Sequence, residues 1–336
     1  MPPLCTIVRT LRALPARRLT VLAALGLGAA TAAQAQSNVT LYGLIDLSAG
    51  SFQAPGGASN KGVDSGNMST SYWGLKGTED LGDGLRANFV MEAFMRNDAG
   101  QSGRFDGDPF WARTSSVGLS NRFGAIDLGR NTTSLFVQTL LFNAFGDSFG
   151  FSPSIRHYFT SGTVSGDTGW ADSVKYSSPS IGGFSFTAHG ALGEANGGRN
   201  EGLSALYFGG PLALGAAWQQ AKKGAAVADT TSWQLAGSYD FKVVKFYAQY
   251  GEVDNDNSHN SYAISGLGGE MTFGVGKLLA QYSQVSPDVG ANRKTASLGY
   301  DHFLSKRTDL YAVYMQDRVG GLSNGNSDAA GMRHRF

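Results

Sequence analysis

Apolar and polar residues alternate strictly between residues 69 and 95. The first half alternates Ser71, Trp73, Leu75, Gly77 with Thr70, Tyr72, Gly74, Lys76, and the second half alternates Leu85, Ala87, Phe89, Met91, Ala93 with Arg86, Asn88, Val90, Glu92. A period of two predicts β-strands, because successive side chains of a strand point to opposite faces. The glycines of residues 80–84 tolerate the positive φ of a tight turn. The pattern therefore predicts an antiparallel hairpin with one apolar and one charged face.

Such a hairpin suits two environments, the half-buried sheet of a soluble sandwich and a barrel wall with lipid outside and water inside. Each predicted strand is about 10 residues long, and a tilted strand that crosses a bilayer needs about 9 to 11. The length agrees with a membrane strand but does not exclude the soluble alternative. The rest of the chain has to decide between them.

The same unit recurs and gives 16 predicted strands: residues 39–47, 70–77, 85–93, 115–119, 126–128, 173–178, 184–189, 201–208, 212–221, 231–240, 244–251, 262–273, 277–285, 294–301, 308–316 and 329–336. Bacterial outer-membrane barrels have an even number of antiparallel strands. A barrel of about 8 strands fills with side chains, whereas about 16 to 18 strands leave an aqueous channel. We therefore predict an all-β, transmembrane antiparallel β-barrel of about 16 strands with a water-filled lumen.

The longest stretch without alternation covers residues 131–171. Its centre, residues 135–145, is too apolar for a loop surrounded by water. A connection of this length is usually functional. We expect it to fold into the barrel lumen and to pack against the inner wall.

Residues 1–35 have the features of an export signal. Four arginines, at positions 9, 12, 17 and 18, precede an apolar run that ends in Ala-Gln-Ala at 33–35. The chain then divides into a signal peptide, residues 1–35, and a barrel domain, residues 36–336. Cys5 is the single cysteine and lies in the signal, so the barrel domain has no disulfide framework.

Composition and charge agree with a membrane barrel. The chain has 47 glycines and a mean hydropathy of −0.16 although 42% of its residues are hydrophobic, as expected when half of each strand faces water. Without the four signal arginines, 23 lysines and arginines remain against 26 acidic residues. Both signs are scattered, which argues against a nucleic-acid partner, because a binder of phosphate backbones has a clustered basic excess.

Signals for catalysis or metal binding are weak. Residues 146–150 match the G-x-S-x-G nucleophile elbow, which needs a strand before the serine and a helix after it; the pattern predicts neither, and the motif recurs at 321–325. The five histidines are dispersed, without ligand spacing. We interpret them as surface or interface residues, and we expect no cofactor and no metal.

Several stretches resemble the general porins of Gram-negative bacteria, particularly the beta-proteobacterial branch. They are residues 39–43 (VTLYG), 73–82 (WGLKGTEDLG), 117–120 (VGLS), 127–130 (DLGR), 304–311 (LSKRTDLY) and 331–336 (GMRHRF). The resemblance implies a homotrimer of barrels in the outer membrane, in contact with lipid and lipopolysaccharide and each narrowed by its third external loop. The terminal Phe336 matches the family's assembly signal, which implies recognition by the barrel assembly machinery.

By position in this family, residues 131–171 form the constriction loop, and Asp147 and Arg156 are its candidate charges. The candidate lumen and wall residues opposite them are Glu92, Arg86, Lys76, Lys175, Arg130 and Arg113. Family members commonly have an arginine where this chain has Tyr72, so the resemblance implies only weak anion selectivity.

The leading hypothesis is a passive channel for ions and small hydrophilic solutes, with a weak preference for anions. An outer-membrane barrel enzyme is the alternative from a different class, and a secreted β-rich adhesin is a third possibility. Conductance across a planar bilayer would distinguish the channel from both.

The mature protein should begin at Gln36, because the Ala-Gln-Ala tripeptide ends the signal. The intact mass of the protein purified from membranes measures this directly. A mass that still includes Cys5 would contradict both the cleavage site and the export route.

Overall fold

The computed structural model describes residues 38–161, 168–193, 198–222 and 229–336. The predicted signal peptide, residues 1–35, and its cleavage site lie outside these residues. The elements in chain order are β1 (Asn38–Phe52), β2 (Asn60–Ser65), β3 (Tyr72–Gly82), β4 (Leu85–Arg96), β5 (Gln101–Ser102), β6 (Thr114–Asn121), β7 (Gly124–Thr132), α2 (Ser134–Leu141), α3 (Pro153–Phe159), β8 (Gly169–Ser177), β9 (Phe184–Ala191), β10 (Asn200–Gly209), β11 (Leu212–Ala221), β12 (Thr230–Asp240), β13 (Val244–Asn255), β14 (Asn260–Phe273), β15 (Gly276–Pro287), β16 (Arg293–Phe303), β17 (Thr308–Val319) and β18 (Gly325–Arg335).

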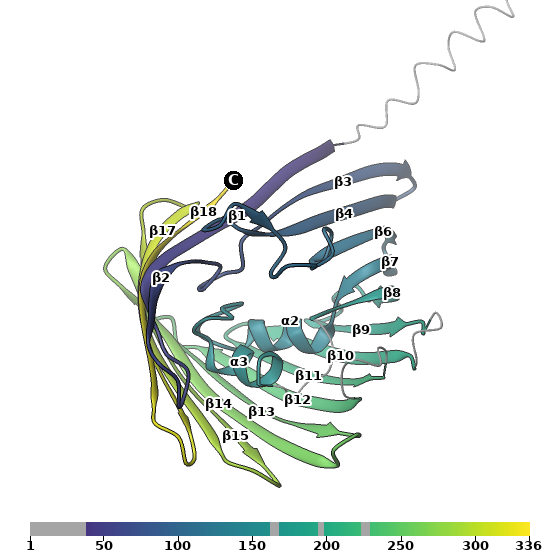
Figure 1. Cartoon of the computed structure of the whole chain (residues 1–336). Helices are drawn as coiled ribbons and strands as arrows, with labels where there is room; N and C mark the ends of the chain where they lie inside the picture. Colours follow the sequence, from purple (N-terminus) through teal and green to yellow (C-terminus); the bar gives the residue numbers. More distant parts are fainter. Residues whose placement is uncertain (1–37, 162–167, 194–197, 223–228) are drawn as a thin grey trace, which may run out of the picture. The chain divides into compact units, whose positions relative to one another are not determined.

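Within this described part of the chain, 16 strands form one closed antiparallel barrel. Neighbours in the ring are neighbours in the sequence, from β1 through β3, β4 and β6 to β18, and β18 pairs with β1 to close it (Figure 1). The prediction of about 16 strands is confirmed. Two short strands were not predicted: β2 pairs with the last six residues of β1, and β5 pairs with the end of β4.

The alternation along each strand separates an inner face from an outer one. On β12, Ser232 and Gln234 are fully buried toward the inside, whereas Leu235, the residue after Gln234, is 55% exposed on the outside. Large apolar side chains are exposed in the same way on other strands, namely Val117, Leu119, Ile126, Leu128, Leu203, Leu214, Phe246, Leu267 and Leu298. An exposed apolar surface of this extent is the face that a barrel presents to lipid.

Outward aromatic residues mark two levels of the barrel. Near the short turns they are Tyr239, Phe241, Phe246, Phe273 and Phe303, and toward the other end they are Trp218, Trp233, Tyr250, Tyr282 and Tyr314. Such girdles flank the apolar band of membrane barrels, and the short turns of these barrels are periplasmic. The long connections of this chain are therefore external.

The long connection between β7 and β8 contains the two helices, which lie inside the ring of strands (Figure 1). Thr133 accepts a hydrogen bond from the backbone of Phe136 and caps α2, and Ser152 caps α3 just before Pro153. α2 lies against β10–β12, and α3 lies against β14–β16. Among the described residues, neither helix nor any other is long and apolar enough to span a membrane.

The inner wall is apolar where the helices cover it. Leu135 and Tyr158 of the helices pack with Val253, Ile264 and Val285, which face inward from three neighbouring strands. All five are almost completely buried. The connection therefore packs on the inner wall through a small hydrophobic core of its own.

The chain end pairs with the first strand. The backbone N–H of Phe336 donates to the carbonyl of Gly43 at 3.1 Å, and the N–H of Gly43 donates back at 3.2 Å. A Cβ atom at position 43 would lie 2.6 Å from the Phe336 ring, so only glycine leaves room for it. The terminal aromatic thus completes the seam of the barrel.

Phe89→Arg should impair folding far more than Asn88→Arg. Phe89 faces outward and covers Gly77, whereas Asn88 faces inward and donates to Ser120 at 2.8 Å. An arginine on the lipid face costs about 2 to 4 kcal/mol near the bilayer midplane, and one in an aqueous lumen does not bear that cost. The heat-modifiable gel mobility of folded barrels reports the yield. Equal folded yields for the two variants would contradict the assignment of faces.

Candidate functional site

The inward-facing residues divide the barrel wall into a covered part and a water-exposed part. Ser232, Gln234 and Ser283, beneath the two helices, are 0% exposed. The inward side chains of Lys76 on β3 and Arg86 on β4 are instead exposed to solvent. The aqueous side of the lumen therefore includes the wall formed by β3 and β4.

Glu92 on this wall is 6% exposed and is held by two partners. Arg113, just before β6, places Nη1 2.6 Å from Oε2 of Glu92, and the hydroxyl of Tyr42 donates to Oε1 at 2.6 Å. Gly74 lies opposite Glu92 in the register, and a Cβ there would come within 2.8 Å of the glutamate Cγ. Because Arg113 compensates the carboxylate, Glu92 does not act as an isolated negative charge.

Two tyrosines support the cations of this cluster. The guanidinium carbon of Arg113 lies 3.9 Å from the ring centroid of Tyr72, and Nζ of Lys76 lies 4.5 Å from that of Tyr42. The two rings meet edge to face, with centroids 6.1 Å apart. Ring faces attract cations, so tyrosine at position 72 fixes an arginine that comes from a different part of the chain.

Asp147 lies between α2 and α3 and connects this segment to the wall. Its Oδ1 accepts a hydrogen bond from the hydroxyl of Ser69 at 2.9 Å. The backbone N–H groups of Ser69 and Met68 both donate to Asp46 at 2.7 Å, and the hydroxyl of Tyr311 donates to the other oxygen of Asp46 at 2.6 Å. The internal segment is thus tied to β1 and β17 through residues 68 and 69.

A buried charge cluster continues from Ser69 along the inner wall. Arg333 on β18 forms an ion pair with Asp309 at 2.7 Å and a second one with Asp301, and it donates to Ser69 at 3.1 Å. Arg335 binds the other oxygen of Asp309 at 2.9 Å. Two arginines and two aspartates compensate each other here, and their inward positions keep all four out of lipid.

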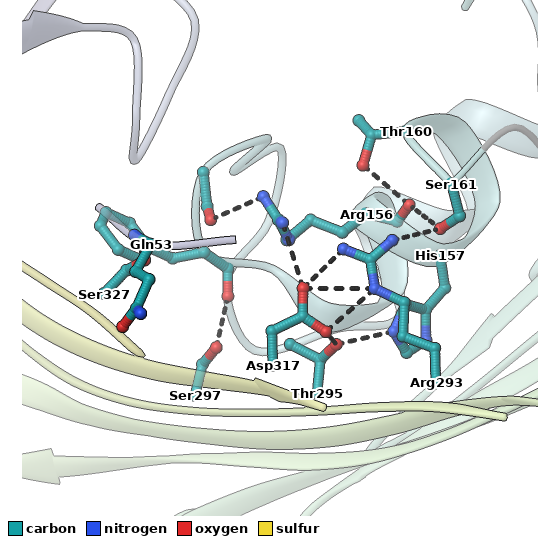
Figure 2. A network of polar contacts seen from close by, with 12 residues as sticks. Gln53, Arg156, His157, Thr160, Ser161, Arg293, Thr295, Ser297, Asp317 and Ser327 are labelled. Atoms are coloured by element: carbon teal, nitrogen blue, oxygen red, sulfur yellow. Dashed lines mark hydrogen bonds and ion pairs between the residues drawn. The ribbon is translucent and has the colours of Figure 1, made fainter. Parts of the chain in front are cut away.

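α3 is anchored by a network centred on Asp317 of β17, shown in Figure 2. Arg293 places Nη2 2.6 Å from Oδ2 of Asp317, and Arg156 reaches the same oxygen at 3.4 Å. Arg156 also donates to the carbonyls of Phe149 and Gly150 at 3.4 and 3.3 Å. Burial, followed by the nearby Arg293, lowers the pKa of Arg156, while Asp317 opposes this. Two cations share one carboxylate, so the network keeps a net positive charge.

His157 follows Arg156 and is completely buried. Nδ1 lies 2.9 Å from the hydroxyl of Ser283 and Nε2 lies 2.8 Å from that of Thr295, which itself donates to Asp317 (Figure 2). Because Thr295 donates its own proton to Asp317, Nε2 of His157 donates to Thr295; the hydroxyl of Ser283, which contacts Nδ1, also donates to the carbonyl of Ser265 at 2.8 Å. Burial, with a further contribution from Arg293, lowers the pKa of His157 to about 3. The interpretation of the histidines as surface or interface residues is wrong here, because the ring fills a polar gap between helix and wall.

The other predicted residues lie elsewhere on the barrel. Arg86 stands opposite Asp80 near the turn between β3 and β4, and inward-facing Lys175 stands between Asp127 and His189 in the register. Arg130 lies at a register irregularity at the end of β7, where its Nε donates to the carbonyl of Ala112 at 2.5 Å. Its register partner is Ser115, in the outward row of Val117 and Leu128. Of the predicted set, the structure brings Glu92, Arg113, Tyr72 and Lys76 together.

The serine of the G-x-S-x-G match stabilises a turn. Ser148 is 0% exposed, its hydroxyl donates to the carbonyl of Asn67 at 2.7 Å, and it accepts from the backbone of Phe151 at 2.9 Å. A nucleophile elbow instead exposes its serine between a strand and a helix. The geometry here is that of a capped turn that leads into α3.

A sequence profile described as Gram-negative porin matches residues 19–322. The chain belongs to this family. Outer membrane porin protein 32 of Delftia acidovorans is 32% identical over 352 residues, which cover 92% of this chain and 97% of the relative. An outer membrane porin protein of Bordetella pertussis is 31% identical, covering 94% of this chain and 98% of the relative. These relationships place the porin in the outer membrane.

Solved structures have the same fold. The anion-selective porin from Comamonas acidovorans superposes with a TM-score of 0.78 at 26% identity, covering 90% of this chain and all of that chain. A loop-deletion mutant of the outer membrane protein OmpT of Vibrio cholerae superposes with a TM-score of 0.70 at 18% identity, covering 89% and 99%. The second likeness concerns the fold alone.

Tyr42, Arg293 and Asp317 were not among the residues predicted for the site. All three alternate with outward residues on their strands, so the period of two marks them as inward-facing. Their partners cannot be found in this way, because Tyr42 and Glu92 are 50 residues apart and Arg156 and Asp317 are 161 apart.

Acid should loosen α3 from the wall through His157. Its pKa is about 3 when buried against 6.5 when free, so the stability that the neutral ring contributes is complete above pH 6.5 and is lost as the pH falls toward 3. The loss is about 1.4 kcal/mol per pH unit below 6.5. Single-channel recordings between pH 7 and 4.5 should show growing current fluctuations.

His157→Gln is the matched control, because glutamine can keep hydrogen bonds to Ser283 and Thr295 without titrating. Its channels should stay quiet over the same pH range. Identical acid-induced fluctuations in both proteins would assign the effect to another group.

Proposed function

We propose that this porin is a water-filled channel for passive diffusion of ions and small hydrophilic solutes, with a weak preference for anions. The observation that carries the proposal is the uneven compensation of charge on the open wall. Glu92 is paired with Arg113, whereas Lys76 and Arg86 have no ion-pair partner within the described parts of the chain. Among the described residues of the same wall, these two cations face one unpaired inward acid, Asp80 opposite Arg86, so a surplus of one positive charge remains there.

An uncompensated charge affects a passing ion much more than a paired one does. A unit charge about 5 Å from a passing ion acts with about 3 kcal/mol at an effective dielectric constant of 20, so an adjacent acid and base nearly cancel. At 0.1 M salt the Debye length is about 10 Å, which mutes charges at a wide mouth more than charges in a narrow passage. A small surplus of uncompensated cations is enough to set the sign of the selectivity.

We propose that residues 131–171 act as the constriction loop, and that Asp147, Arg156, Glu92, Arg113 and Tyr72 belong to the narrow passage. The support is the packing of this segment on the inner wall and the hydrogen bond between Asp147 and Ser69. Lys76, Arg86 and Lys175 extend the basic side along the lumen. Arg130 contributes only at the rim, because its strand ends there and its register partner Ser115 lies in the outward row.

The relative from Comamonas acidovorans is described as anion-selective, which supports the proposed preference for anions.

We also propose that the porin assembles as a homotrimer, since one similar structure is described as a trimer form. The exposed aromatic end, Phe336, would be recognised by the barrel assembly machinery. Lipid and lipopolysaccharide are the partners of the outward face.

Glu92→Gln should shift selectivity toward anions, and Arg113→Gln should shift it toward cations, because each variant leaves one member of the pair uncompensated. We expect a change on the order of threefold in the chloride-to-potassium permeability ratio. The zero-current potential under a potassium chloride gradient measures it. Arg130→Gln, at the rim, should give a smaller shift toward cations.

A strongly cation-selective unmodified channel would contradict the proposed preference. Shifts of the same sign for Glu92→Gln and Arg113→Gln would show that the pair does not lie in the passage.

A further inference from the structure

Two cations stand directly opposite each other on the outer face of β16 and β17. Lys294 is the register partner of Arg318, and both are exposed. Lys294 precedes Thr295 and Arg318 follows Asp317, and both Thr295 and Asp317 point inward in the network of Figure 2. Because successive side chains of a strand point to opposite faces, the two cations point outward. Neither side chain has a hydrogen bond or ion pair with any described residue.

This arrangement is electrostatically unfavourable on its own. Like charges directly opposite each other destabilise an antiparallel pair of strands. The outward acid of β18, Asp328, lies opposite Tyr314, two outward rows from Arg318. Gln284 on β15, the other neighbour of Lys294, is uncharged. The row therefore lacks a compensating anion from the strands beside it.

The two cations lie at the level of lipid headgroups. The next outward row toward the membrane pairs Ala296 with Gln316, and the girdle residue Tyr282 is the other partner of Ala296. At about 3.3 Å per residue, Lys294 lies about 7 Å along the strand beyond that row. The short turn between β16 and β17 is at the opposite end, so the cations are on the external side.

An apolar groove of about 1140 Å³ begins just below the two cations. Its upper edge is the row of Ala296 and Gln316. Small outward residues, among them Gly237, Ala248, Ala280 and Ala296, leave the space, and Leu214, Leu267, Tyr282, Leu298 and Tyr314 flank it. A groove of this kind fits an acyl chain that lies along the barrel wall.

We propose that the Lys294–Arg318 pair and this groove form a site for one lipopolysaccharide molecule of the outer leaflet. A phosphate group binds between the two cations through charge-assisted hydrogen bonds and removes their repulsion. An acyl chain of the same molecule fills the groove beneath. The site deepens the proposed contact with lipopolysaccharide, but it does not depend on ion selectivity, because its residues face away from the lumen.

The test uses the mature porin in neutral detergent, titrated with purified lipopolysaccharide, with the rise in thermal stability as the readout of binding. The double variant Lys294→Gln/Arg318→Gln should bind at least tenfold more weakly. The matched control is Lys306→Gln/Arg307→Gln, which removes one lysine and one arginine from the periplasmic turn and should bind like the unmodified protein. Single-channel conductance should be unchanged in both variants.

Two further variants keep the result interpretable. Lys294→Glu places opposite charges in the row, which favours folding, and it should lose binding to the same extent. Ala296→Trp fills the upper groove and should weaken lipopolysaccharide binding at least tenfold. Inorganic phosphate at the same phosphate concentration should give little stabilisation, because it leaves the groove empty.

Equal affinity in the double variant and its control would overturn the site. Full stabilisation by inorganic phosphate, or unaltered binding by Ala296→Trp, would overturn the role of the groove. Loss of binding together with an altered conductance would mean that the cations act on the lumen, contrary to the proposal.

Discussion

The hydrocarbon core of a membrane offers no hydrogen-bond partner for a backbone N–H or carbonyl group. The pairing of β18 with β1 closes the barrel, so no strand edge is left unpaired in the hydrocarbon. Eight consecutive register pairs, from Leu44 with Arg335 to Ser51 with Asp328, form this seam, and Phe336 extends it to Gly43. A slip of one residue would turn every side chain of β18 to the other face. Arg333 would then leave its aspartates and face lipid, so the inward charge cluster and the closure require the same register.

The internal segment is held in a different way from the wall. Strands are held by backbone hydrogen bonds, whereas α2 and α3 depend on a small apolar core and on buried polar contacts with residues distant in the sequence. A buried ion pair contributes little net stability, but breaking it leaves an uncompensated charge. The network around Asp317 therefore acts mainly by selecting one position for α3. In any other position, Arg156 or His157 would lose its hydrogen-bond partners. The wall is adapted to this position, because Val253, Ile264 and Val285 are apolar where the helices cover them.

The sequence was sufficient for the strand number and the two faces, because alternation is local and each strand repeats it. The helices could not be predicted, since segments of eight and seven residues are not stable alone and form only against the wall. Arg113 lies outside any strand, so alternation could not assign it a face, and only the structure brings it to Glu92. Arg130 does lie on a strand, and the sequence of that strand alternates regularly. Its pairing with β8 shifts at Gly129, however, so alternation does not determine which way Arg130 faces.

Not every charged side chain that faces the lumen acts on a passing ion. The sequence suggests a basic wall with a few acids, yet most inward charges of the described strands form compensated groups. Glu92 belongs to Arg113, and Arg333 and Arg335 are balanced by Asp301 and Asp309. Asp317, shared by Arg156 and Arg293, compensates only one of its two cations. Compensation stabilises each group and also removes it from the long-range field, since opposite charges at contact distance nearly cancel a few ångströms away. Selectivity is thus left to the few cations that no acid compensates, which is why a chain with so many inward charges is expected to discriminate only weakly.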